Sequence, residues 1–371
     1  MSEQVKITII YTYRNRDAKR VRYSLLSLQQ QCVQNFKVLF IDYGSEVQEA
    51  KAVQVMVEGF RFASYHYVAH EGLLWNKSKA LNYGIKHAET SYIITSDIDV
   101  LFAPQFVKTV ATQINPGSFS LFQIGYLSKK ETKRQLTNLD FDTISTTHIG
   151  DTFGIALFPK KALETVRGLD EFFHFYGSED EDLNQRVQMA GYKLKRCNEL
   201  MLYHQWHMRY PKKQDNVLHI HPRLTNVVRL NQRHFLWHKA HCKVQTNPKS
   251  WGNCYSKADL KSLERPDIII QLDNILAHVE HCFGVVLAHH SNSIVQIIVS
   301  EAPYYKSLKY KLKQALGKQT QSYMTMKAVN DLILKEILYR YRDMNYAYKV
   351  TENLKHIYFT IDFKTRPDDQ N

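Results

Sequence analysis

Two aspartates one residue apart, Asp97 and Asp99, follow a short run of β-branched and aromatic residues from Tyr92 to Ser96. Such a run is typical of a buried strand, and residues i and i+2 of an extended chain point to the same side. Two carboxylates at such a short separation repel each other unless a cation lies between them. The pair is therefore a candidate site for a divalent metal and, through it, for a diphosphate. Solvated turn aspartates are the alternative, and the neighbouring segments must decide.

A basic loop follows the first predicted strand, Val5 to Tyr11. Backbone amides and the side chains of Tyr13, Arg14 and Arg16 there suit a diphosphate and a base, because ligands of α/β sheets bind at the carboxyl ends of strands. The alternative is that both arginines are solvated charges. Asp42 ends the second predicted strand, where a carboxylate either accepts from a ribose hydroxyl or a nucleobase N–H, or caps the next helix.

Two predicted helices open with polar side chains. In the first, Trp75 to Ala88, Lys79 and Asn82 are candidates to meet phosphate or sugar. The second, Ser178 to Ala190, begins with four acids in succession, Glu179-Asp180-Glu181-Asp182. Acids in a first turn suit the helix dipole, but four exceed what capping requires. A capped, solvated helix start is the alternative to a catalytic cluster.

Histidines gather after the last strand of this half. His204 and His207 have the i, i+3 spacing that can place two imidazoles on one metal, although core or surface histidines are the common alternative. A second group, His238 and His241 with nearby cysteines, fits no standard zinc spacing.

Segments with the alternating hydrophobic pattern of strands follow segments with the 3.6-residue pattern of helices along the chain. We expect strands at residues 5–11, 36–42, 63–68, 92–96, 119–126, 152–158, 192–196 and 200–203, and helices at 19–31, 46–57, 75–88, 105–113, 160–166 and 178–190. This order predicts an α/β fold with a Rossmann-like, mostly parallel sheet covered by helices. Ser128 to Ile149 lacks periodicity and predicts a long functional or mobile loop.

The pattern changes after residue 210. Three divisions are expected: a nucleotide-binding domain at 1–210, a connecting helical segment at 211–264 and a C-terminal α/β or helical module at 265–371. In that module the apolar runs 268–270, 285–287 and 294–299 predict strands, 304–357 is largely helical, and 359–363 is a last strand. The cationic tail is a candidate to dock an anionic glycan, a lipid-linked acceptor or a membrane.

Composition narrows the class of protein. Of 371 residues 44% are hydrophobic, enough for a large core, and the net charge of +13 favours an anionic partner. The five cysteines are scattered without a C-x-x-C, which indicates a reducing compartment. The sequence opens directly into a strand, without a signal peptide, and contains no apolar run of ~20 residues. We expect a cytoplasmic protein, or one peripheral to the inner face of a membrane.

Six motifs occur in one order: Arg14-Asn-Arg16, Asn76-Lys-Ser-Lys-Ala-Leu-Asn82, Asp97-Ile-Asp99, Phe153-Gly154, Gly168-Leu-Asp170 and Gly177-Ser-Glu-Asp-Glu-Asp182. In these motifs the stretch from residue 5 to 210 resembles a GT-A fold glycosyltransferase. It is similar to the β-1,4-galactosyltransferases and to bacterial family 2, chondroitin-polymerase-type enzymes. Each motif alone is weak, but their order is specific. The part of the chain beyond 210 resembles no family that we can name.

The resemblance implies roles for individual residues. Asp180 is the general base, with Glu179 and Glu181 near the acceptor hydroxyls, and Asp99 binds Mn²⁺ or Mg²⁺. The family's late ligands are Met-x-x-His, so His204 and His207 would join Asp99 here.

The sequence also departs from the galactosyl enzymes. Tyr176 stands for their tryptophan, Glu181 for an aspartate and Thr152 for a tyrosine. These changes leave the sugar and the acceptor open. Threonine at 152 predicts a roomier donor pocket, so that UDP-GalNAc or UDP-GlcNAc suits it at least as well as UDP-Gal.

The sequence thus predicts an inverting, metal-dependent glycosyltransferase. It would move a hexose or N-acetylhexosamine from a UDP-sugar to a glycan or lipid-linked saccharide, in the synthesis of a bacterial polysaccharide such as a capsule or lipopolysaccharide. A nucleotidyltransferase is the first alternative, although the loop from Thr12 to Arg16 lacks the glycines typical of that class. A nucleic-acid-binding protein is the second, with Tyr304 to Tyr348 as its weak candidate surface.

Overall fold

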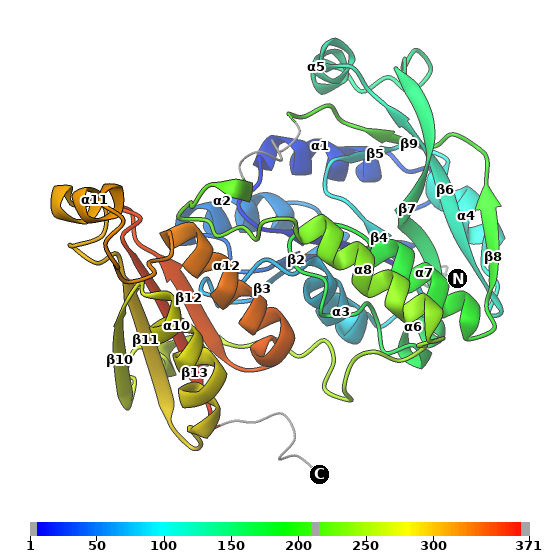
Figure 1. Ribbon diagram of the computed structural model, residues 1–371. Helices are drawn as coiled ribbons and strands as arrows, with labels where there is room; N and C mark the ends of the chain where they lie inside the picture. The colour runs from blue at the N-terminus through cyan, green and yellow to red at the C-terminus, as the bar shows by residue number, and fades with distance from the viewer. Residues whose placement is uncertain (1–5, 209–214, 365–371) are drawn as a thin grey trace. The chain divides into compact units, whose positions relative to one another are not determined.

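The computed structural model describes residues 6–208 and 215–364 and divides into two compact units. Unit 1 contains residues 1–68, 75–209 and 228–254, and unit 2 contains 69–74, 210–227 and 255–371. The domain boundary expected at 210/211 lies outside the described residues. The three-part division into 1–210, 211–264 and 265–371 stays a prediction. Figure 1 shows the elements of both units.

Unit 1 is built on a nine-stranded sheet with the order β3-β2-β1-β4-β7-β6-β9-β5, and β8 pairs with β6. The strands are β1 (Ile7–Tyr13), β2 (Phe36–Asp42), β3 (Ala63–Tyr67), β4 (Tyr92–Ser96), β5 (Val100–Phe102), β6 (Ser118–Tyr126), β7 (His148–Pro159), β8 (Lys193–Cys197) and β9 (Leu202–His204). The four strands β3, β2, β1 and β4 run parallel, and β7 turns the direction by pairing antiparallel with β4. The predicted α/β, GT-A-like fold is confirmed.

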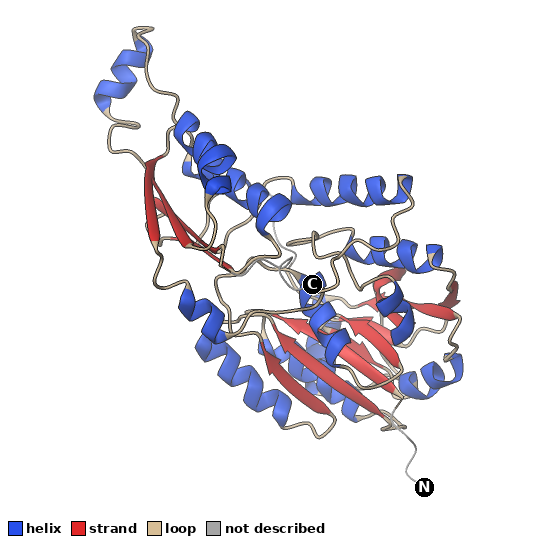
Figure 2. Cartoon of the chain, turned by 90° about the horizontal axis from the view of Figure 1, so that it is seen from below, coloured by secondary structure: helices blue, strands red, loops and turns tan. Residues whose placement is uncertain are grey.

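Helices cover this sheet (Figure 2). They are α1 (Ala18–Gln29), α2 (Val47–Glu58), α3 (Lys77–His87), α4 (Phe106–Gln113), α6 (Lys160–Thr165), α7 (Glu179–Met189) and α8 (Val227–Ala240). All seven residues of β1 are buried, as expected for a parallel strand covered on both faces. Val21, Leu25 and Leu28 of α1 are buried at helical spacing. Unit 1 therefore holds the carboxyl ends of its parallel strands on a rigid core.

The stretch Ser128–Ile149, expected to be a loop, was predicted wrongly in part. It contains helix α5 (Lys129–Thr137), and β7 already begins at His148. The hydroxyl of Ser128 caps the helix by accepting from the Glu131 amide, and Arg134 binds the Glu131 carboxylate at 2.6 Å. Polar contacts stabilise this helix, so it lacks the apolar stripe that periodicity detects.

Unit 2 contains a four-stranded sheet with the order β10-β11-β13-β12. Its strands are β10 (Ile268–Asp273), β11 (Ile294–Ser300), β12 (Tyr346–Val350) and β13 (His356–Asp362), and its helices are α9 (Lys257–Ser262), α10 (Leu276–His281), α11 (Leu308–Ala315) and α12 (Met326–Glu336). The largely helical C-terminal portion agrees with the prediction, and the sheet adds to it.

Two expectations in this unit were wrong. The run 285–287 is not a strand, because it lies in a π-helical and a 3₁₀ turn, Cys282–Val286 and Leu287–His289. Strand β12 also interrupts the region expected to be helical. No helix in the described ranges has both the length and the apolar character of a membrane span.

Candidate active site

The short strands β5 and β9 bring the predicted metal ligands together. They pair antiparallel with Val100 opposite His204, and the Gln205 amide donates to the Asp99 carbonyl at 2.9 Å. His204 Nε2 lies 3.6 Å from Asp99 Oδ1, and His207 Nε2 lies 3.3 Å from Asp99 Oδ2. The backbone ladder therefore fixes one carboxylate beside two imidazoles that follow much later in the chain.

The donor atoms of this trio fit one divalent cation. One atom from each of Asp99, His204 and His207 lies within 4.8 Å of the others. Carboxylate and imidazole donors are usual ligands of divalent transition metals. Arg20 Nη1 also contacts Asp99 Oδ2, at 3.2 Å. The carboxylate thus faces positive or protonatable groups, which shows that the fold surrounds it with neutralising partners.

A second cluster lies around Lys77, the first residue of α3. Its Nζ is 3.2 Å from Asp97 Oδ1, 3.3 Å from Asp180 Oδ2 and 3.8 Å from Glu179 Oε1. The Lys77 side chain is 18% exposed. One cation therefore joins the Asp-x-Asp strand end to the acidic start of α7.

Asp180 has an unusual protonation equilibrium in this cluster. Burial raises its pKa to about 7, and the negative charges of Glu179 and Asp97 add to the rise, while Lys77 opposes it. The pKa of Asp97 moves the other way, because Lys77 lowers it more than burial raises it. A carboxyl with a pKa near neutrality can take and release protons under ordinary conditions, which is what a general base requires.

The turn before α7 sets the position of Asp180. Phe175, Gly177 and Ser178 all have positive φ, at 65°, 106° and 67°, a conformation that is costly for the two non-glycine residues. Glu179 supports the turn by accepting from the Gly177 amide at 2.9 Å. Strained backbone of this kind is often found where a functional group must be placed.

Strand β7 packs directly on Asp180. A Cβ added at Gly154 would come within 2.5 Å of Asp180 Oδ2, so only glycine allows the carboxylate to lie there. The hydroxyl of Thr152 accepts from the Gly154 and Ile155 amides at 3.2 and 3.1 Å. Thr152 therefore shapes the backbone beside the predicted base, and its role toward the donor sugar stays a prediction.

The predicted nucleotide-binding residues lie at the ends of β1 and β2. The Tyr13 hydroxyl donates to the Arg16 carbonyl at 2.6 Å, which stabilises the loop that carries Arg14 and Arg16. Asp42 is buried and accepts from the Ser45 amide at 2.9 Å and the Tyr65 hydroxyl at 2.7 Å. Burial raises the pKa of Asp42 despite these bonds. Its nucleotide contact stays a prediction, as do those of Tyr13, Arg14 and Arg16.

Lys79 and Asn82 lie in a buried network with the loop before α7. The Asn82 amide donates to the Leu169 carbonyl at 2.8 Å and to Glu171 Oε1 at 3.0 Å, and its oxygen accepts from the Leu169 amide. Lys79 Nζ is 3.7 Å from Glu171 Oε2. These contacts hold α3 against the loop, and phosphate or sugar binding by the two residues stays a prediction.

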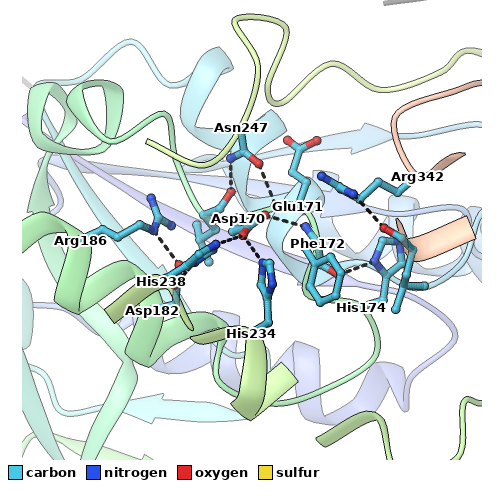
Figure 3. Close-up of polar contacts among 12 residues, drawn as sticks. Asp170, Glu171, Phe172, His174, Asp182, Arg186, His234, His238, Asn247 and Arg342 are labelled. Atoms are coloured by element: carbon cyan, nitrogen blue, oxygen red, sulfur yellow. Dashed lines mark hydrogen bonds and ion pairs between the residues drawn. The ribbon is translucent and has the colours of Figure 1, made fainter. Parts of the chain in front are cut away.

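A separate buried network joins α7 to α8 (Figure 3). Asp182 accepts from Arg186 Nε at 2.6 Å and from His238 Nδ1 at 2.7 Å, and His234 Nε2 lies 2.9 Å from Asp170 Oδ2. Asp170, His234 and His238 have the spacing of a cation site. Protein hydrogen bonds already account for both Asp170 oxygens, because Oδ1 accepts from the Phe172 amide at 2.8 Å.

Two residues of the site were missed in the sequence. Lys77 is one: it lies in the same motif as Lys79, but residues i and i+2 of a helix face different sides, and sequence alone did not show which faced the acids. Arg20 is the other, since an arginine on α1 gives no signal that it reaches Asp99. Glu181, predicted near the acceptor, is exposed on α7.

Two family models match the chain in this region. Residues 8–166 match the family described as glycosyl transferase family 2, and residues 131–210 match the N-terminal domain of galactosyltransferase. Together they span residues 8–210, which hold all strands of unit 1 except the first residue of β1. They confirm the resemblance to GT-A glycosyltransferases that the motifs indicated. No curated protein matches the sequence.

The chain also matches solved structures at low sequence identity. TarS 1-349 of S. aureus in complex with UDP is 14% identical, with a TM-score of 0.41, over 53% of this chain and 60% of that one. The mannosyltransferase PcManGT from Pyrobaculum calidifontis in complex with GDP-Man and Mn²⁺ is 15% identical, with a TM-score of 0.44, over 85% of this chain and 80% of that one. The chain thus spans under two thirds of the TarS structure that it matches.

Proposed function

We propose that this chain is an inverting, metal-dependent glycosyltransferase that moves a hexose or N-acetylhexosamine from a UDP-sugar to a glycan or lipid-linked saccharide. The observation that carries the proposal is the position of Asp180. Its carboxylate and that of Asp97 both contact the Lys77 ammonium. Asp97 lies two residues before Asp99, which belongs to the candidate metal trio with His204 and His207. A proton acceptor and a candidate cation site therefore share one strand end.

Asp180 is the proposed general base. Its carboxylate takes the proton of the acceptor hydroxyl as that oxygen attacks the anomeric carbon, and the bond to the diphosphate breaks on the opposite face. A single displacement of this kind inverts the anomer. Lys77 holds the carboxylate in place at 3.3 Å and favours its charged form before the proton arrives. Glu179 supports the same turn, and Glu181 lies on the exposed side where an acceptor would approach.

Asp99, His204 and His207 would hold the metal, Mn²⁺ or Mg²⁺. A divalent cation at that place supplies positive charge to the leaving diphosphate. The donor set contains two imidazoles, which favours Mn²⁺ over Mg²⁺, because Mg²⁺ is bound mainly by oxygen.

The nucleotide would lie across the ends of β1 and β2. Arg14 and Arg16 are proposed to contact the diphosphate, and Tyr13 and Asp42 to shape the base and ribose pocket. Asp97, about half exposed at the same strand end, faces the donor side as well. Lys79, Asn82 and Thr152 complete the proposed donor site, the first two through the loop that they anchor. The setting that we propose is polysaccharide synthesis in the cytoplasm or at the inner membrane face.

A screen of nucleotide-sugars tests the proposal. Purified protein is incubated with UDP-Gal, UDP-GalNAc, UDP-GlcNAc and GDP-Man, with Mn²⁺ or with EDTA, and released nucleotide is measured. We expect release from at least one UDP-sugar in Mn²⁺ and none in EDTA. Release from no donor under any condition would contradict a glycosyltransferase, and full activity in EDTA would contradict the metal.

Substitution of Asp99 by alanine tests the metal dependence of turnover independently of folding. We expect Asp99→Ala to lose Mn²⁺-stimulated turnover and to keep an unchanged circular dichroism spectrum. Asp142→Ala is the matched control, because Asp142 is an exposed loop aspartate that belongs to neither the metal trio nor the Lys77 cluster. Near-normal turnover of Asp99→Ala in chelator would remove Asp99 from the metal site.

A further inference from the structure

Helix α11 of unit 2 exposes an unusual set of leucines. Leu308, Leu312 and Leu316 are 87%, 61% and 60% exposed. They follow one another at i, i+4 and i+8, so on an ideal helix they lie within about 80° of each other and form one stripe. Single exposed leucines are ordinary on a protein surface. Three at this spacing on one short helix and its C-cap residue, Leu316, are not, and they define the leucine stripe of α11.

Lysines border the stripe on both sides. Lys309 and Lys313 lie at about 100° and 140° from Leu308 around an ideal helix, and Lys311 at about 300°. The stripe occupies about 0° to 80°, so each edge carries positive charge. From Lys306 to Lys318 the sequence Lys-Ser-Leu-Lys-Tyr-Lys-Leu-Lys-Gln-Ala-Leu-Gly-Lys contains five lysines and no acid. The leucine stripe therefore lies in a strongly cationic surround.

The opposite face of α11 fixes its orientation. Tyr310, at about 200° on the same wheel, is buried and packs with Tyr304, Tyr305 and Tyr323 at ring-centroid distances of 5.8, 5.7 and 5.5 Å. Gln314 donates to the Tyr310 hydroxyl at 2.8 Å. This tyrosine anchor leaves the leucine stripe facing away from the body of unit 2, and Figure 1 shows α11 beyond the strands of that unit.

Both ends of the helix are well defined. The Ser307 hydroxyl accepts from the Tyr310 amide at 3.1 Å. At the other end Gly317 has φ +65°, its amide donates to the Gln314 carbonyl at 3.0 Å, and the Lys318 amide donates to the Lys313 carbonyl at 2.9 Å. This is a Schellman stop. The helix keeps its phase as far as Leu316, so the three leucines stay in register.

We propose that α11 docks unit 2 on an anionic lipid surface, with the leucine stripe in the boundary of the acyl chains and the lysines on the headgroups. A helix with a leucine face and a lysine-rich border lies in such an interface, and each lysine near the surface adds attraction to anionic lipid. Charge complementarity selects this occupant over a second copy of the chain, because two α11 helices would bring two cationic borders together. The proposal does not depend on the proposed enzymatic activity.

Vesicle sedimentation tests it with the full chain. Phosphatidylcholine vesicles are compared with vesicles that also contain phosphatidylglycerol, an anionic lipid that attracts lysine clusters. The test variant is L308Q/L312Q/L316Q, because glutamine keeps helix propensity and removes the apolar stripe. Val55→Gln on α2 is the matched control, since Val55 is 75% exposed on an unrelated helix.

We expect wild type and Val55→Gln to bind the anionic vesicles and to lose most binding in 0.5 M salt, since exposed charges are screened beyond about 5 Å there. The triple variant should bind at least tenfold more weakly, with an unchanged melting temperature. Equal binding of the triple variant and wild type would overturn the proposal, and so would equal binding to neutral vesicles. A dimer in light scattering that the triple variant abolishes, without vesicle binding by wild type, would assign the stripe to a second copy instead.

Discussion

Helix α7 contributes to two clusters of charge that behave in opposite ways. Asp180 belongs to the cluster around Lys77, and Asp182, two residues later on another side of the helix, belongs to the network with Arg186 and His238. In the first cluster the pKa of Asp180 rises to about 7. In the second, burial would raise the pKa of Asp170, but the hydrogen bond and charge of His234 bring it down to about 2.

The number of partners explains the difference. Lys77 alone faces three carboxylates within 3.8 Å, so that part of the site has less positive than negative charge. In the network of Asp170 and Asp182, a guanidinium and two imidazoles face two carboxylates. A site short of positive charge takes up protons or cations, which is useful for catalysis. In the second network each carboxylate has its own hydrogen-bond donors, and these contacts hold α7 and α8 together.

The largest expected effect on turnover comes from a substitution in the Lys77 cluster. Asp180→Asn is nearly isosteric but cannot accept a proton, so we expect turnover to fall by ~10²- to 10⁴-fold while donor binding is retained. Steady-state kinetics and donor titration measure the two quantities. Asp142→Asn is the control. Unchanged turnover would move the role of base to Glu179 or Glu181.

Breaking the second cluster is expected to cost stability and spare chemistry. Asp182→Ala leaves Arg186, 1% exposed, without its carboxylate, and removal of one partner of a buried pair costs about 3 to 5 kcal/mol. Urea unfolding measures the free energy, and Asp142→Ala is the control. A loss below about 1 kcal/mol would show that the network is as weak as a surface pair.

Many strands and helices of unit 1 were predictable because their hydrophobic residues follow the period of the element that they form. The run from Phe36 to Asp42 and the run from Tyr92 to Ser96 are strands with the predicted bounds. Helix α5 was missed because capping and an ion pair stabilise it. The apolar run 285–287 was predicted as a strand and is helical, since propensity is weak over three residues.

The site was predictable as a set of segments, but its contacts were not. The motifs placed Asp97, Asp99, His204, His207 and the acids of α7 in one region, and the structure brings them close. Which lysine of α3 faced the acids depended on helix phase. That phase is fixed by the cap at Asn76, whose side-chain oxygen accepts from the Lys79 amide at 2.8 Å, and by packing that sequence does not display.

A pH profile of turnover tests the raised pKa of Asp180 and is expected to show a smaller effect than the two substitutions above. Asp180 is active as a base only when deprotonated, and its pKa is raised from 3.8 to about 7. Turnover should therefore fall about tenfold per pH unit below about 7 and level off above it. Lys77→Met removes the charge that lowers this pKa, so the acid limb should move to higher pH. A flat profile between pH 5 and 8, roughly the range around that pKa, would contradict the assignment.

The smallest expected effect concerns the donor side of the Asp180 cluster. Thr152→Tyr adds a ring near Gly154, where the resemblance places the sugar's 2-position. We expect kcat/KM for UDP-GalNAc and UDP-GlcNAc to fall relative to UDP-Gal by a factor corresponding to ~1 to 3 kcal/mol or less. Comparison of the three donors in wild type and variant measures it. A wild-type preference for UDP-Gal that the tyrosine leaves unaltered would contradict the open pocket.

The pairing of β5 with β9 has a consequence for synthesis of the chain. Strand β5 is three residues long, lies at the end of the sheet path and pairs with β9, which the ribosome releases roughly a hundred residues later. At ~5 to 20 residues per second the nascent chain waits several seconds with Asp99 separated from both histidines. The proposed affinity of the trio for a cation would therefore appear only after β9 has inserted between β6 and β5, so that metal uptake would report this insertion.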